Sequence, residues 1–155
     1  MKTKSGLKTI LTAVFASFLL VLTVTFAKFP ASPSPIFIYC VCITLIRGDK
    51  KSLILSGVFG LLTDILCGNV FFTNTCFFAY ISLGCAELNT RLKCSLKTAL
   101  LCVFISTLLF STFNVLVNFS VSNFGFWFLK SVLPETLVST ALAVIIYPLA
   151  AQSYR

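Results

Sequence analysis

The sequence contains no histidine and only four acidic residues among its 155. Its seven cysteines include no pair with Cys-x-x-Cys spacing. Zinc and haem sites usually draw on histidine or on closely spaced cysteines, so we interpret the cysteines as small apolar packing residues. Catalytic triads and two-carboxylate sites lack the necessary side chains too. We therefore expect no enzyme activity, no cofactor and no metal.

Charged residues are also scarce, at 10% of the chain against about 25% in soluble domains, whereas 58% of the residues are hydrophobic. The formal charge is +8. However, Lys and Arg stand in small groups between apolar runs, without the interleaved aromatics of nucleic-acid surfaces. No nucleic-acid partner is predicted, and the composition indicates a protein embedded in a lipid bilayer.

Six apolar segments predict an all-α, polytopic membrane protein with about six transmembrane helices in a single domain, residues 1–155. We place the helices at about 10–27, 35–46, 52–67, 70–86, 98–121 and 133–151. The second segment is short for a crossing, which needs about 20 residues. It spans only if the proline-rich stretch before it enters the membrane interface or if neighbouring helices shelter it.

The distribution of basic residues sets the orientation, because cytoplasmic loops are enriched in Lys and Arg. With both termini in the cytoplasm, the cytoplasmic segments hold Lys2, Lys4, Lys8, Arg47, Lys50, Lys51, Arg91, Lys93, Lys97 and Arg155. Only Lys28 and Lys130 fall outside. Phe126-Trp127-Phe128 is typical of an aromatic anchor at the interface, and Pro134 suits the first turn of the last helix.

The third predicted helix carries a stripe of small and polar residues. Ser56, Gly60, Asp64 and Gly68 recur every four residues and so share one helix face. Small residues at this spacing let a neighbouring backbone approach closely, which is how helices associate in lipid. The stripe is therefore predicted to be a helix-packing or partner-contact face.

Asp64 needs a specific role, because an unpaired acid in the membrane costs at least about 2.5 kcal/mol at mid-depth. Three roles compete: a structural hydrogen-bond partner that caps or ties down the break at Gly68, a contact with a partner protein, and an ion or substrate site. Asp64 lies one turn before Gly68, towards the external end of the helix. This position favours the structural role.

A second polar stripe, formed by Thr107, Ser111, Asn114 and Asn118, follows one face of the fifth predicted helix. Asparagine side chains in lipid normally face other helices, where they form hydrogen bonds across the interface. We interpret the stripe, with Asn114 and Asn118 as its strongest members, as a second packing or partner contact. Asn74, Tyr80 and Glu135 are possible partners for it.

The run Leu45-Ile46-Arg47-Gly48, followed by the segment from Ser56 to Gly68, resembles the MreD family of bacterial rod shape-determining membrane proteins. In that family an Arg-Gly turn leads into a helix of the form G-x-x-x-G-L-L-x-D-x-x-x-G. The final segment, Leu133-Pro134-Glu135 through Tyr147-Pro148-Leu149, resembles the last helix of the family. The resemblance covers most of the chain.

This resemblance implies a non-enzymatic scaffold of the cell-elongation machinery in the bacterial inner membrane, which regulates cell shape and lateral wall synthesis. It implies as partners MreC, the actin-like MreB, and a peptidoglycan glycosyltransferase and transpeptidase. It also implies a fold like that of the substrate-binding membrane subunits of energy-coupling-factor transporters. A vitamin-binding transporter subunit is therefore the alternative function.

Overall fold

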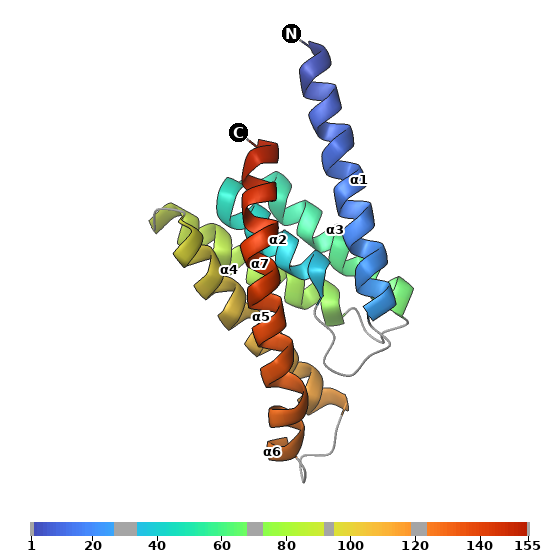
Figure 1. Ribbon diagram of the computed structural model, residues 1–155, viewed down its shortest axis with the longest axis vertical. Helices are drawn as coiled ribbons and strands as arrows, with labels where there is room; N and C mark the ends of the chain where they lie inside the picture. Colours follow the sequence, from blue (N-terminus) through green and yellow to red (C-terminus); the bar gives the residue numbers. More distant parts are fainter. Residues whose placement is uncertain (1, 27–33, 68–72, 92–94, 119–123, 155) are drawn as a thin grey trace.

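The computed structural model describes residues 2–26, 34–67, 73–91, 95–118 and 124–154, and within these ranges every regular element is helical (Figure 1). The elements are α1 (Lys2–Phe26), α2 (Pro35–Arg47), α3 (Lys50–Cys67), α4 (Thr73–Arg91), α5 (Leu96–Asn118), α6 (Phe124–Trp127), the π-helical turn η3 (Phe128–Val132) and α7 (Leu133–Tyr154). The last three are contiguous, so six long helical rods result. The predicted all-α class is confirmed for the described ranges.

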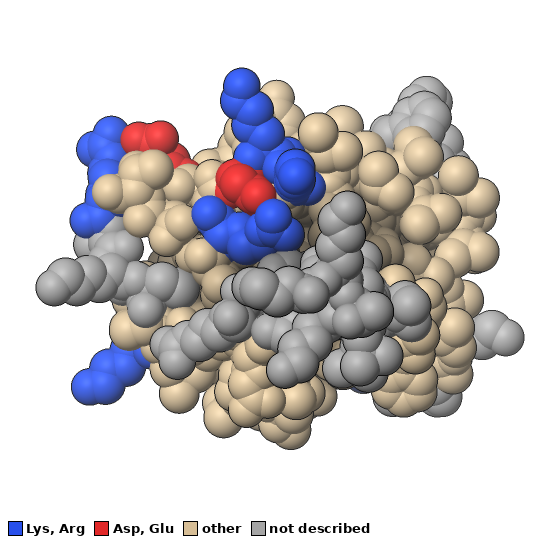
Figure 2. Space-filling view, turned by 90° about the horizontal axis from the view of Figure 1, so that it is seen from above, with Lys and Arg blue, Asp and Glu red and all other residues tan. Residues whose placement is uncertain are grey.

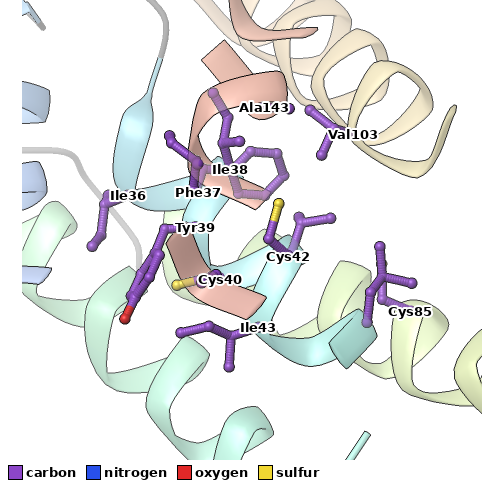
Figure 3. Close-up of a cluster of buried hydrophobic side chains, with 14 of the residues drawn as sticks. Ile36, Phe37, Ile38, Tyr39, Cys40, Cys42, Ile43, Cys85, Val103 and Ala143 are labelled. Atoms are coloured by element: carbon purple, nitrogen blue, oxygen red, sulfur yellow. The ribbon is translucent and has the colours of Figure 1, made fainter. Parts of the chain in front are cut away.

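The centre of the bundle is α2, which contacts α1, α3, α4, α5 and α7. Every residue from Pro35 to Leu45 is buried (Figure 3). Its 13 residues span about 20 Å at 1.5 Å per residue, less than the hydrocarbon thickness of about 30 Å. The short helix is thus sheltered by its neighbours, one of the two conditions that the sequence set for it.

Both ends of α2 have backbone groups that form hydrogen bonds with neighbouring residues. Pro35 has no N–H, and the N–H of Ile36 donates to the hydroxyl of Thr23 on α1 at 3.2 Å. At the other end Gly48 adopts a left-handed conformation with φ 59° and donates its N–H to the carbonyl of Thr44. Because glycine adopts this conformation at no steric cost, the turn into α3 can be tight.

Aromatic rings join α2 to its neighbours. Phe37 stacks on Phe110 of α5, with ring centroids 5.1 Å apart, and lies 4.9 Å from the ring of Phe78 on α4. Tyr39 meets Phe15 of α1 edge to face at 5.6 Å. Buried rings supply large apolar areas with defined geometry, so these contacts fix how α1, α4 and α5 sit around α2.

Two helical stretches, Leu96–Leu116 and Phe128–Gln152, are long and apolar enough to cross a membrane. Thr12–Thr25 and Pro35–Arg47 are shorter apolar helices. Large aliphatic side chains on several helices point outward, among them Val14, Ile54, Ile65, Leu109 and Leu137. An outward apolar surface of this kind suits a bundle surrounded by lipid.

Several helices extend beyond the predicted apolar segments. α1 begins at Lys2 rather than near residue 10, and α4 continues to Arg91 rather than ending near residue 86. The Arg91 guanidinium pairs with the Glu87 carboxylate one turn earlier, at 2.9 Å, and such pairs favour helix. Hydropathy marks the edge of the hydrocarbon, whereas a helix also continues through polar residues.

The last helix, α7, begins at Leu133, so Pro134 lies in its first turn as predicted. The short helix α6 and the π-helical turn Phe128–Val132, which the sequence did not predict, precede it without a break. Proline lacks the N–H that an α-helix needs and clashes with the carbonyl four residues earlier. The wider π turn just before Pro134 relieves this crowding, so the chain stays helical through the proline.

Candidate functional site

The antiparallel helices α3 and α4 pack closely along the predicted stripe. The structure places Ser56, Gly60 and Asp64 on the buried face of α3, against Asn74, Phe78 and Ser82 of α4. We call these six residues, together with Thr75, the α3–α4 seam. Gly68 lies outside the described residues.

Asp64 caps the start of α4 from the neighbouring helix. Its Oδ1 accepts a hydrogen bond from the backbone N–H of Asn74 at 3.1 Å, and its Oδ2 accepts one from the N–H of Thr75 at 2.8 Å and one from the Thr75 hydroxyl at 2.7 Å. The first N–H groups of a helix have no partner within it, and they carry the positive end of the helix dipole. A carboxylate that is only 4% exposed therefore finds three donors and a favourable field.

Gly60 lies at a close approach of the two backbones. A Cβ atom at this position would be 2.7 Å from the Cα of Thr75 and 3.1 Å from the carbonyl oxygen of Asn74. Real side chains do not tolerate such distances to a neighbouring backbone, so only glycine fits unless the helices separate. By contrast, a Cβ on Gly57 would meet nothing within 4 Å.

Ser56 continues the seam towards the other end of the hairpin. Its hydroxyl donates to the carbonyl of Phe78 at 3.2 Å and accepts a hydrogen bond from the Ser82 hydroxyl at 2.5 Å. No matching stripe was predicted on α4. Its buried residues nevertheless recur at steps of three and four residues, at Asn74, Phe78, Ser82 and Cys85. This spacing could have predicted the face of α4 that packs against α3.

The α2–α3 turn closes the cytoplasmic end of the hairpin in the predicted orientation. Asp49 accepts a hydrogen bond from the N–H of Ser52 at 3.0 Å and pairs with Arg47 at 2.7 Å. Partial desolvation raises the pKa of Asp49, but the Ser52 hydrogen bonds and the Arg47 charge outweigh it and hold the pKa below its usual value. A Cβ on Gly48 would collide with the side chain of Asn89 on α4, so this glycine too allows a close approach.

The second predicted stripe lies between α5 and α7. Thr107 and Ser111 are buried, Asn114 is partly buried, and the side chain of Asn118 is outside the described part. Ser111 faces Glu135 of α7, one of the possible partners, whereas Tyr80 is exposed on α4. Sequence reasoning missed Thr136 and Ser139, the buried polar residues that α7 contributes.

The chain matches the family model described as rod shape-determining protein MreD over residues 2–155, essentially its whole length. No curated protein and no solved structure shows a significant match. The family match agrees with the resemblance carried by the Arg47-Gly48 turn and the stripe that ends at Asp64 and Gly68. The chain therefore belongs to the MreD family of rod shape-determining membrane proteins.

Proposed function

We propose that the chain is a multi-pass scaffold of the cell-elongation machinery in the bacterial inner membrane, acting through protein partners rather than catalysis. The observation that carries this proposal is the family match over residues 2–155. By family resemblance the partners are MreC, MreB and the wall-synthesis glycosyltransferase and transpeptidase. Through them the chain would regulate cell shape and lateral wall synthesis.

The use of the acidic side chains supports a non-enzymatic role. Asp64 caps α4, Asp49 caps α3 and pairs with Arg47, and Glu87 pairs with Arg91. Three of the four acids are thus engaged in holding the α3–α4 hairpin and its ends. Within the described residues no three His, Cys, Asp or Glu side chains gather into a group able to hold a metal.

The arrangement of charge supports six crossings with both termini in the cytoplasm. The Lys2 end of α1, the Arg47–Lys50 turn and the Tyr154 end of α7 lie towards one end of the bundle (Figure 1). Figure 2 shows Lys and Arg side chains on this end, with acidic side chains among them. Lys130 lies near the opposite end, at the start of the last rod. This asymmetry is the positive-inside pattern.

Within this scaffold we infer that the α3–α4 seam is an internal brace. The seam residues form their hydrogen bonds and close contacts with each other. Ser56, Gly60 and Asp64 therefore stabilise the packing of α3 against α4. Asn114 and Asn118 of α5 remain the residues that we propose to contact partner proteins. The lipid bilayer is the other proposed partner of the chain. The brace would hold the outer faces of α3 and α4 in one geometry for partner proteins.

Depletion of the protein followed by microscopy tests this function. We expect cells to widen or lose rod shape, and a plasmid copy of the wild-type chain to restore them. Gly60→Leu should fail to restore shape, because the side chain would separate α3 from α4, whereas Gly57→Ala should succeed. All copies must reach equal membrane levels by blotting. Normal shape combined with lost vitamin uptake would instead support the transporter-subunit alternative.

A further inference from the structure

The interface between α5 and α7 contains an unusual number of polar side chains for the interior of a membrane protein. Thr107 and Ser111 on α5 and Thr136 and Ser139 on α7 are all at most 3% exposed. Glu135 lies beside them and is partly buried. Intramembrane acids are rare and usually mark a functional site, so the surroundings of Glu135 decide what it can bind.

Glu135 lies within the stretch Phe128–Gln152, which is long and apolar enough to cross a membrane, towards the external end of the last predicted helix. It follows Trp127, in the predicted aromatic anchor, by eight residues, which is about 12 Å along a helix. The ion pairs of the described residues are Arg47 with Asp49 and Arg91 with Glu87, so no basic side chain neutralises it there. Lys130, one turn away, places its Nζ over the ring of Phe126. Among the side chains that the structure describes, none therefore forms an ion pair with the Glu135 carboxylate, the two ion pairs being those of Asp49 and Glu87.

The antiparallel register of the two helices brings side-chain oxygen atoms opposite each other at two levels, one helical turn apart. Ser111 faces Glu135, and further along the pair Val103 and Ala143 point toward one another in the core (Figure 3). Between these two pairs the same register places Thr107 opposite Ser139. Because Ser139 follows Glu135 by four residues, both share one face of α7.

The hydroxyls at these two levels have unused hydrogen-bonding capacity. The Oγ atom of Ser139 is buried, at 1% residue exposure, and has no hydrogen-bond partner, whereas the equally buried Oγ atom of Ser111 faces the Glu135 carboxylate. Thr107 donates its hydroxyl to the carbonyl of Val103 at 2.8 Å, which leaves its oxygen lone pairs available. Buried polar atoms without a partner are uncommon in folded proteins and require an explanation such as a bound ion or water.

We propose that Glu135, Ser111, Ser139 and Thr107 bind one sodium ion between α5 and α7. All four ligands are hard oxygen atoms, which suit non-transition cations, and one carboxylate balances one positive charge. A divalent ion would leave an uncompensated charge in a low-dielectric site. A basic side chain from another protein is too large for hydroxyls that are already enclosed. The π-helical turn just before Pro134 also fits, since such turns are frequent at functional sites.

Thermal unfolding of the purified full chain in detergent tests the proposal, with sodium, potassium and choline chloride compared at equal ionic strength. Sodium should raise the midpoint in a saturable manner, because a ligand that binds only the folded state stabilises it by mass action. Glu135→Gln should abolish the sodium response. The same midpoint in all three salts would overturn the proposal, as would a sodium response that survives in Glu135→Gln.

Two further variants separate ion binding from a structural effect. Ser139→Ala removes an unpartnered hydroxyl, so in choline chloride the variant should be at least as stable as the wild type. It should, however, need about tenfold more sodium to reach half of the maximal rise in the unfolding midpoint. Glu87→Gln, which removes an exposed acid outside the site, should keep the full sodium response. If Ser139→Ala responds to sodium as the wild type does, Ser139 is not a ligand and the site as proposed is wrong.

Discussion

The carboxylate of Asp64 on α3 accepts hydrogen bonds from both the backbone N–H and the hydroxyl of Thr75 on α4, at 2.8 and 2.7 Å. One acidic side chain of α3 thus accepts the hydrogen bonds of donors in the first turn of α4. In a lipid environment water does not compete for these donors, so the loss of the acceptor leaves them unsatisfied. This relationship makes Asp64 the most testable residue of the seam.

Replacement of Asp64 should reveal how much of its role is hydrogen bonding. Asn keeps one acceptor oxygen and should lower the unfolding midpoint moderately. Leu removes both acceptors and should cost about 2 kcal/mol or more, because each buried donor left unpaired costs about 1–3 kcal/mol. Thermal unfolding in detergent measures the order. Thr63→Ala, which removes a methyl group and a hydroxyl bonded within its own helix but no partner of α4, is the control. Equal stability of Asp64→Leu and wild type would refute the capping role.

Gly60→Ala should destabilise the hairpin, whereas Gly57→Ala should not. The added methyl group at residue 60 meets the backbone of Thr75 at 2.7 Å, and overpacking of this kind costs about 1–3 kcal/mol. At residue 57 the methyl group meets nothing within 4 Å, and alanine favours helix by about 1 kcal/mol. The two variants should shift the unfolding midpoint in opposite directions. Equal shifts would mean that α3 and α4 do not touch at Gly60.

The pH dependence of stability should contain a contribution from Asp49. Its pKa is held below the ordinary value of 3.8, so the charged form stabilises the fold above that value, and the contribution is lost as the pH falls below it. Asp49→Asn keeps a helix-capping side chain but loses the charge that pairs with Arg47. The wild type should therefore be more stable than the variant at neutral pH, and the difference should shrink as the pH falls below 3.8. A difference that grows on acidification would reverse the assigned sign.

Cysteine labelling from outside the cell tests the orientation. In a background without the seven native cysteines, a membrane-impermeant maleimide should react with Ser32→Cys and Lys130→Cys but not with Lys50→Cys or Lys97→Cys. The latter two should react only after the membrane is opened, which shows that they are accessible at all. Labelling of Lys50→Cys in intact cells would invalidate the arrangement with both termini inside.

Much of the α3–α4 seam was predictable from spacing. Ser56, Gly60 and Asp64 fall on one face because four residues make slightly more than one helical turn, and small residues in lipid indicate close packing. The sequence does not show which helix covers this face. The contact with α4 depends on how the two antiparallel helices align, and that alignment is a feature of the tertiary structure. Thr75 was therefore missed, although it makes two hydrogen bonds to Asp64.

The sequence by itself determined the all-α class, the membrane composition and the family, since hydropathy, the periodic small residues and the Arg47-Gly48 turn are local features. Only the tertiary structure decided that α2 is enclosed on all sides, that Asp64 caps α4, and that Ser111 and Ser139 lie near Glu135. It also decided that α6 and a π-helical turn precede the last helix without a break. These outcomes depend on which helix surfaces meet, and residues far apart in the chain fix that choice through packing.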